Sequence, residues 1–283
     1  MTEKKTLHER LQTASRKWGL TQIQSIYVRE NSAVFRADSA GVGSVILKIG
    51  EDPVAIAREY FALLEMRGRA CCQVYALDRE NALLLEERIS PGTALKQEPD
   101  WERRAVIFTR VFEDIHVVPK DETRYNSYLN WVKDASRSVQ NHNNKQLAEG
   151  MCRAVDIAVK MFEKYPERVL LHGDLHHENI VRNAASENYV VIDPKGVVGP
   201  FIFDIPRFLL NELDDRKDSL RRVHINKMIE KMSHLLGYPA ADIYQLFFME
   251  VMLASAWFYE DAEEISERDM RFAWSEVLRM EEQ

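Results

Sequence analysis

The sequence contains few cysteines, no long hydrophobic run and no excess of positive charge. Its three cysteines, Cys71, Cys72 and Cys152, form an odd number and two of them are adjacent. They therefore predict no disulfide framework, and they favour a reducing cytoplasm. The net charge of -7 argues against a nucleic-acid partner, because non-specific binding of nucleic acid needs a basic face.

Signals for a membrane or for secretion are also missing. The longest apolar stretch, residues 246–259, is shorter than a bilayer requires and is interrupted by Glu250, so it predicts a buried helix. The first residues, MTEKKTLHERLQ, are not followed by an apolar segment, which argues against a signal peptide. We therefore expect no membrane partner and a cytoplasmic location.

The remaining composition is that of a folded protein. Hydrophobic residues make up 46% of the chain and charged residues 29%, which argues against general disorder. A chain of 283 residues is long enough for one large domain or two modest ones. It shows no internal repeat that would indicate a solenoid.

The first part of the chain predicts an antiparallel sheet. Thr6 and Glu9 form a capping box that begins a helix, and Gly19 is expected to end it. Pro53 is expected in the first turn of a second helix with one apolar face. Five strand-like segments are predicted, at residues 25–28, 34–37, 45–49, 73–77 and 83–86. The second helix therefore follows the third strand.

The pattern becomes helical after Pro91. Two long apolar faces are predicted, from Trp101 to Ile115 and from Leu147 to Phe162. The segment from Ala240 onward is again helical. Ser90, Pro91 and Gly92 form the best boundary candidate.

We therefore predict a small β-rich lobe at residues 1–89, joined to a larger, mainly α-helical lobe at residues 90–283. Ligands are expected in the cleft between the lobes, because concave sites commonly form where two such units meet.

The most informative stretch, residues 170–204, contains three oxygen-bearing side chains at characteristic spacing. Asp174 is followed by Asn179 five positions later, and Asp193 ends the second of two strand-like segments after it. Phosphoryl transfer needs one carboxylate beside the attacking hydroxyl and oxygen ligands for magnesium. The pattern therefore predicts Asp174 as the base and Asn179 and Asp193 as magnesium ligands.

A zinc site is the alternative interpretation of this stretch, because it also contains His172, His176, His177 and Glu178. Their order does not fit H-E-x-x-H, and no second cluster of histidine or cysteine completes a ligand set.

Two residues upstream fit the same chemistry. Lys48 lies in the third predicted strand and Glu59 in the helix after it, and such a pair holds the α- and β-phosphates of a nucleotide. A glycine-rich G-x-G-x-x-G loop is missing between the first two strands. Only ten residues separate Asp193 from Asp204, too few for an activation loop and a peptide platform. A protein substrate is therefore disfavoured.

The motifs HGDLHHENI and VIDPKGVVG resemble the aminoglycoside phosphotransferase family of protein-kinase-like enzymes. They are most similar to the branch of aminoglycoside 6-phosphotransferases and hydroxyurea phosphotransferases. LKIG at residues 47–50 and LLLEERISPG from Leu83 resemble the same branch. The similarity spans roughly residues 30 to 210.

The resemblance implies an α+β, protein-kinase-like bilobal fold, with nucleotide bound by the small antiparallel lobe and the acceptor by the helical lobe. It implies that ATP (or GTP) and Mg²⁺ are the cofactors. It also implies that the backbone from Glu87 to Ile89 meets the purine, and that Asp204 is a buried support for the catalytic loop.

The acceptor implied by this branch is a small polyhydroxylated, cationic molecule such as a streptomycin-like aminoglycoside. Acidic residues that could face it are Glu212, Asp214, Asp215, Glu260 and Asp261. Kinases of cellular metabolites, such as an amino alcohol, a sugar or a hydroxy amino acid, share the same catalytic set. The sequence is also compatible with a nucleotide-binding pseudokinase or a helical interaction module, although neither would need the full catalytic set.

Overall fold

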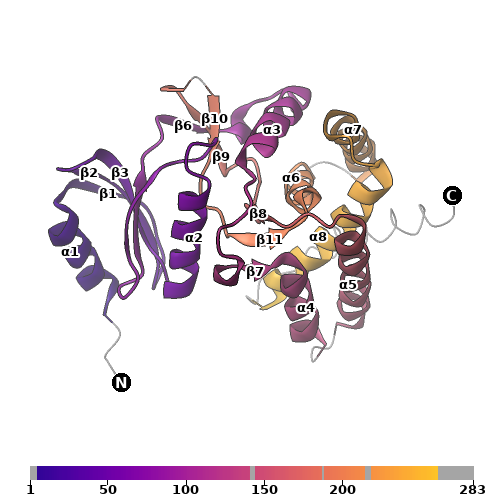
Figure 1. Cartoon of the computed structure of the whole chain (residues 1–283), viewed down its shortest axis with the longest axis horizontal. Coiled ribbons are helices and arrows are strands. Elements are labelled where there is room, and N and C mark those ends of the chain that lie inside the picture. Colours follow the sequence, from indigo (N-terminus) through magenta and orange to yellow (C-terminus); the bar gives the residue numbers. More distant parts are fainter. Residues whose placement is uncertain (1–4, 141–143, 187, 214–217, 261–283) are drawn as a thin grey trace.

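A small lobe built around a β-sheet packs beside a larger lobe of helices in this computed structural model (Figure 1). The structure describes residues 5–140, 144–186, 188–213 and 218–260. The sheet belongs to the N-terminal part of the chain, and most of the helices follow it. This arrangement confirms the predicted α+β, bilobal fold. The exact division at residues 89 and 90 stays a prediction.

The small lobe has the predicted order of strands and helices. It consists of α1 (Leu7–Trp18), β1 (Leu20–Val28), β2 (Ala33–Ser39), β3 (Gly43–Ile49), α2 (Pro53–Glu65), β4 (Val74–Asp78) and β5 (Leu83–Glu87). The five strands form one antiparallel sheet in the order β1-β2-β3-β5-β4. The predicted helix after the third strand is α2, and β1 begins five residues earlier than expected.

Local signals set the ends of the two helices. The Thr6 hydroxyl accepts a hydrogen bond from the Glu9 amide at 3.3 Å, and the Glu9 carboxylate accepts one from the Thr6 amide at 2.8 Å. This is the predicted capping box. Gly19 ends α1 in the left-handed conformation, with φ of 59°. The Asp52 carboxylate caps the free amides of the first turn of α2.

Buried and less buried side chains alternate along β3, so one side of the strand faces the core of the small lobe. Val45, Leu47 and Ile49 are buried in a cluster with residues of α1 and β2. Successive side chains of a strand point to opposite faces, so Ile46 and Lys48 lie on the other face of the sheet.

The large lobe contains six helices and several short strands within the described ranges. They are β6 (Pro91–Ala94), α3 (Trp101–Ile115), β7 (Asn126–Ser127), α4 (Tyr128–Val139), α5 (Lys145–Lys164), β8 (Val169–Leu171), β9 (Ile180–Asn183), β10 (Asn188–Val191), β11 (Val197–Gly199), α6 (Ile205–Asn211), α7 (Asp218–Leu236) and α8 (Ala240–Glu260). The helices predicted from Trp101, Leu147 and Ala240 are α3, α5 and α8. Helices α4, α6 and α7 were not predicted.

The short strands of the large lobe form two small sheets. β6 begins at Pro91 and pairs with β9, which pairs with β10. The predicted boundary at Ser90 to Gly92 is therefore the start of a paired strand and not a free linker. β11 joins β7 and β8 in a second small sheet.

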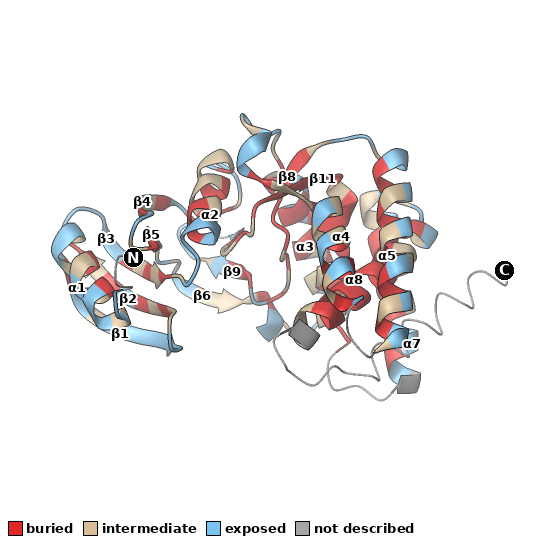
Figure 2. Cartoon of the chain, turned by 90° about the horizontal axis from the view of Figure 1, so that it is seen from below, coloured by how far each residue is buried: buried red, intermediate tan, exposed pale blue. Residues whose placement is uncertain are grey.

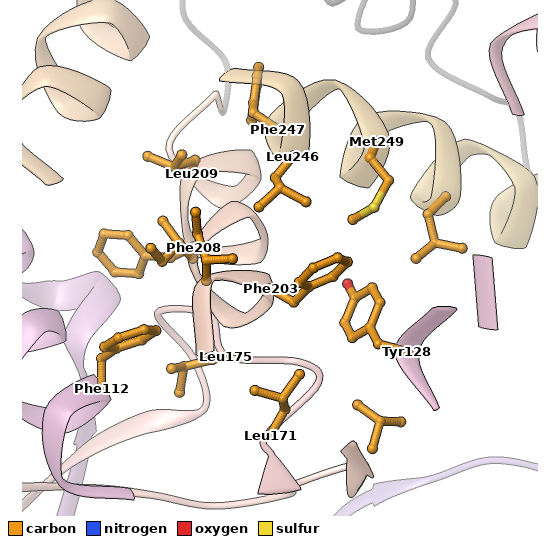
Figure 3. Packing of buried hydrophobic residues seen from close by; sticks show 14 of the residues in the cluster. Phe112, Tyr128, Leu171, Leu175, Phe203, Phe208, Leu209, Leu246, Phe247 and Met249 are labelled. Carbon is orange, nitrogen blue, oxygen red and sulfur yellow. The ribbon is translucent and has the colours of Figure 1, made fainter. Parts of the chain in front are cut away.

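The core of the large lobe lies between α6 and the helices around it (Figure 3). The ring centroids of Phe208 and of Phe108 on α3 are 4.3 Å apart, and those of Phe203 and of Tyr128 on α4 are 5.0 Å apart. Figure 2 shows the buried residues gathered on the inward faces of these helices.

Helix α8 is the predicted buried helix. Its residues 246–256 are all buried, including Glu250, which interrupts the apolar run. Among the described residues, no helix combines the length and the apolar character that crossing a membrane requires.

Candidate active site

A cavity of about 540 Å³ lies between the sheet of the small lobe and the strands β6 and β9. It is lined by all six residues predicted to bind nucleotide or metal, namely Lys48, Glu59, Glu87, Ile89, Asn179 and Asp193. Asp174 lies directly beside it, because the Asn179 amide nitrogen donates to the Asp174 carbonyl at 2.9 Å. The tertiary structure thus brings together all seven predicted site residues.

Lys48 is the centre of a buried charge cluster. Its ammonium group forms ion pairs with Glu59 on α2, with Glu86 at 3.1 Å and with Asp193 at 3.2 Å. Burial by itself lowers the pKa of Lys48, but the three carboxylates raise it well above its ordinary value, so Lys48 is charged. The expected pairing of Lys48 with Glu59 is present.

The cluster contains more acid than base. Burial raises the pKa of Glu59 to about 8 and also raises that of Glu86, and the repulsion of neighbouring carboxylates adds to both rises. One oxygen of Glu86, Oε2, is buried and has no hydrogen-bond partner. Such a cluster favours the arrival of a further cation.

Asp174 is held by an arginine from α6. The Arg207 Nε donates to Asp174 Oδ1 at 2.8 Å, and Arg207 Nη1 donates to the buried Glu250 at 3.2 Å. Burial raises the pKa of Asp174, but His176, Arg207 and Lys195 offset this and hold the pKa well below its usual range. Asp174 is therefore a carboxylate whose direction is fixed by Arg207.

Asp204 supports the start of the loop that carries Asp174. Its carboxylate accepts hydrogen bonds from the amides of His172 and Gly173, both at 2.8 Å, and from the His116 ring at 2.9 Å. It is 1% exposed, so it contacts the loop backbone and not a ligand. Gly173 is needed there, because its φ is +78° and a Cβ would approach the Val197 side chain to 2.9 Å.

Asn179 and Asp193 supply two oxygen atoms that fit a magnesium ion. Burial raises the pKa of Asp193, but Lys48 and Lys195 hold it well below its usual range, so the side chain is a carboxylate. The Asn179 amide nitrogen is used by Asp174, which leaves the amide oxygen to bind a cation. Magnesium takes few protein oxygens and keeps waters and phosphates as its other ligands, so this donor set suits it.

The histidines of this stretch make other contacts. The His172 ring is hydrogen-bonded to the Ile192 carbonyl at 2.9 Å and the His177 ring to Glu212 at 2.7 Å. Within the described part of the chain, no group of three or more His, Cys, Asp or Glu side chains is arranged to hold a metal ion. The geometry therefore does not support the zinc alternative.

Glu87 and Ile89 line the cavity where β5 ends. The Glu87 amide donates to the Gln73 carbonyl at 2.8 Å, and its carboxylate accepts from the Gln73 amide at 3.0 Å. These bonds fix the segment against the preceding strand. Contact with the purine base of a nucleotide would therefore involve the Glu87 carbonyl and the backbone that follows it.

The family profile described as aminoglycoside/hydroxyurea antibiotic resistance kinase matches residues 17–262. The chain belongs to this kinase family. It is accordingly a phosphotransferase that acts on a hydroxyl group of a small molecule. A search of curated proteins gives no significant match.

Solved structures of similar fold come from several kinds of small-molecule kinase. A thermostable variant of aminoglycoside phosphotransferase APH(4)-Ia with ADP and hygromycin B has a TM-score of 0.66 at 13% identity, with 93% of this chain and 94% of that chain covered. Choline kinase LicA from Streptococcus pneumoniae has a TM-score of 0.64 at 13% identity, covering 96% and 98%. An ethanolamine kinase from Plasmodium vivax has a TM-score of 0.66 at 12% identity, covering 99% and 89%. At these identities the likeness shows the fold.

Three residues of the kinase site were not predicted, namely Glu86, Lys195 and Arg207. Glu86 and Lys195 each lie beside a predicted residue in a motif, LLLEE and DPKG, so the sequence offered a signal for them. Arg207 follows Asp174 by 33 positions and belongs to no motif, so only the packing of α6 reveals it.

Glu212 corrects one prediction about the acceptor. Its carboxylate is 2% exposed and accepts hydrogen bonds from Arg104, His177 and His224, at 2.7 to 2.8 Å. It therefore joins α3, α7 and the catalytic loop and is not available to an acceptor. Asp214, Asp215 and Asp261 lie outside the described residues, and so does the side chain of Glu260.

The Glu212→Gln variant is expected to lose at least about 2 kcal/mol of unfolding free energy, because Arg104, whose side chain is only 11% exposed, is left without its counter-charge. Urea denaturation followed by circular dichroism measures this loss. The matched control is Glu178→Gln, which removes an exposed pair with Lys96 and should cost less than about 0.5 kcal/mol. Equal losses in the two variants would show that Glu212 has no special structural role.

Proposed function

We propose that this kinase transfers the γ-phosphoryl group of ATP (or GTP), with Mg²⁺, to a hydroxyl group of an aminoglycoside of the streptomycin type. The observation that carries the proposal is the meeting of Lys48, Asn179, Asp193 and Asp174 at one cavity, in a chain of the aminoglycoside/hydroxyurea kinase family. The reaction belongs to the cytoplasm, where the nucleotide is available.

The nucleotide would occupy the cavity of about 540 Å³. Lys48, held in place by Glu59, would bind the α- and β-phosphates, and the backbone from Glu87 to Ile89 would meet the purine. Solved APH(4)-Ia structures include complexes with ADP and AMP-PNP, which supports nucleotide binding by this chain. Residues 1–89 would then be the nucleotide-binding lobe, and residues 90–283 would carry the catalytic loop and the acceptor site.

Asn179 and Asp193 would hold the magnesium ion. When bound, this ion neutralises charge on the phosphate oxygens and orients them for transfer. Glu86 and Glu59 contribute to the fit, because both lie, with Asp193, within ion-pair distance of Lys48.

Asp174 would accept the hydrogen bond of the acceptor hydroxyl and take its proton. The acceptor oxygen bonds to the γ-phosphorus, the bond from that phosphorus to the bridging oxygen breaks, and the nucleoside diphosphate leaves. The low pKa of Asp174 makes it a weak base. Its main contribution is therefore the alignment of the hydroxyl, which Arg207 secures by fixing the carboxylate.

An amino-alcohol kinase is the second candidate. The solved choline kinase and ethanolamine kinase match this chain with TM-scores of 0.64 and 0.66, close to the 0.66 of the aminoglycoside phosphotransferase. Glu212 is buried and bound to Arg104, so one fewer acidic residue is available to attract a multiply charged acceptor.

The test is an assay of ADP formation with a panel of acceptors, namely streptomycin, hygromycin B, hydroxyurea, choline and ethanolamine. Mass spectrometry of the products confirms that a phosphoryl group was added. We expect the highest kcat/KM for an aminoglycoside, and the same product must disappear in the Asp174→Asn variant.

Each competing function has its own result. Phosphorylation of choline or ethanolamine alone would replace the aminoglycoside proposal with the amino-alcohol one. If the protein binds nucleotide but forms no ADP, either with the acceptors of the panel or with water alone, it is a pseudokinase. If the chain binds no nucleotide, it is an interaction module.

A further inference from the structure

Lys195 lies between the two carboxylates on which the proposed reaction depends. Its ammonium nitrogen is 2.9 Å from Asp193 Oδ2 and 3.8 Å from Asp174 Oδ2. Lys48 approaches the other Asp193 oxygen, Oδ1, at 3.2 Å. Asp193 therefore has a lysine at each oxygen, one on the side of Glu59 and one on the side of Asp174.

The backbone holds Lys195 against the catalytic loop. The Lys195 amide donates to the His172 carbonyl at 2.7 Å. Asp193 and Gly196 on either side are both in the left-handed conformation, with φ of 63°, so the chain turns tightly around Lys195. A Cβ on Gly173 would lie 3.5 Å from the Cβ of Lys195, which shows how closely the two segments approach.

The two lysines differ in their surroundings. Lys48 is 12% exposed and is enclosed by three carboxylates, whereas the side chain of Lys195 is 41% exposed. Its ammonium group lies beside two carboxylates, those of Asp193 and Asp174, and carries its positive charge between them. Lys195 is therefore the more accessible of the two charged groups, and less of its side chain is enclosed by carboxylates.

We propose that Lys195 is a further catalytic residue, which binds the transferred phosphoryl group between Asp193 and Asp174. The inference rests on the proposed function. During transfer, the acceptor oxygen at Asp174 and the nucleotide phosphates at Asp193 lie on opposite sides of the γ-phosphorus. The equatorial oxygens of that group then pass through the space that the Lys195 ammonium faces.

Lys195 keeps its proton throughout the step. The proton of the acceptor hydroxyl goes to Asp174, and the electron pair of the broken bond leaves with the nucleoside diphosphate. Lys195 donates hydrogen bonds to the equatorial oxygens as their charge spreads in the transition state. Such an interaction accelerates the chemical step more than it strengthens nucleotide binding.

The test uses the full chain with ATP and magnesium, and it needs no known acceptor, because water replaces the hydroxyl compound in slow hydrolysis. Single-turnover ADP formation by Lys195→Met should fall on the order of a hundredfold. The Kd for ATP with magnesium, measured by calorimetry, should change less than about threefold. Lys195→Arg keeps the positive charge and should recover part of the rate.

The matched control is Lys17→Met, because Lys17 is 48% exposed, pairs with Asp78 at 2.8 Å, and neither residue lines the cavity. Its rate should equal that of the wild type. The thermal melting temperature of each variant shows that it is folded.

Two results would overturn the inference. In the first, Lys195→Met hydrolyses ATP at the rate of the wild type. In the second, its rate falls only in proportion to weaker nucleotide binding, which would make Lys195 a neutralising ion pair for Asp193. A wild-type protein that forms no ADP with water or with any acceptor of the panel would overturn the proposed function, and the role of Lys195 with it.

Discussion

The Asp174→Asn variant should bind nucleotide normally and transfer phosphate more slowly, on the order of a thousandfold, in line with the loss of a general base. Asparagine has the shape of the carboxylate but cannot take the proton of the acceptor hydroxyl. It also loses the charge-assisted bond from Arg207 Nε, which is 2.8 Å long and fixes the side chain. Steady-state kinetics with the acceptor found in the panel measure kcat.

The control for this prediction is Asp134→Asn, a change on the surface of α4 where the side chain is 52% exposed. It should leave kcat unchanged. Calorimetry with ATP and magnesium checks that Asp174→Asn still binds nucleotide. If its kcat stays within about threefold of the wild type, Asp174 is not the base.

The Asp193→Asn variant should lose both magnesium-dependent nucleotide affinity and turnover. Asn179 then remains as the one predicted protein ligand, and several kcal/mol of charge stabilisation in the transition state are lost. Since about 1.4 kcal/mol corresponds to a factor of ten, turnover should fall on the order of a thousandfold. Asparagine suits this position because it tolerates the left-handed backbone, where φ is 63°.

The informative measurement compares ATP binding with and without magnesium. In the wild type, magnesium should raise the affinity, and in Asp193→Asn this gain should disappear. Asp134→Asn again serves as the control. If magnesium raises the ATP affinity of the variant as much as that of the wild type, Asp193 does not bind the metal and serves only as a partner of Lys48 and Lys195.

Much of the small lobe could be predicted from short stretches of sequence. The capping box of Thr6 and Glu9, the stop at Gly19 and the alternation along β3 are all decided by residues close together in the chain. The five strands and the helix after the third were found for this reason.

Helices α4, α6 and α7 could not be found in the same way. α6 has only seven residues and carries a proline in its first turn. It is largely buried between neighbouring helices, so its sequence shows no regular polar face. α7 carries buried polar residues such as His224, which is bound to Glu212. Their helical structure depends on contacts with distant residues, which periodicity does not record.

The sequence by itself determined the chemistry of the site. The spacing of Asp174, Asn179 and Asp193, with Lys48 and Glu59 upstream, indicated phosphoryl transfer, because that reaction needs those donors in that order. Local patterns also determined the antiparallel lobe that carries Lys48.

Only the tertiary structure decided which charges meet. Lys48 contacts Asp193 across 145 positions, Arg207 on α6 reaches Asp174 in a loop 33 positions earlier, and Glu212 is buried among three basic partners instead of facing an acceptor. Charged side chains are exposed by default, and whether one becomes buried depends on a counter-charge brought to it by the packing of sheets and helices. That packing also places Lys195 between the two carboxylates, which the DPKG motif alone does not reveal.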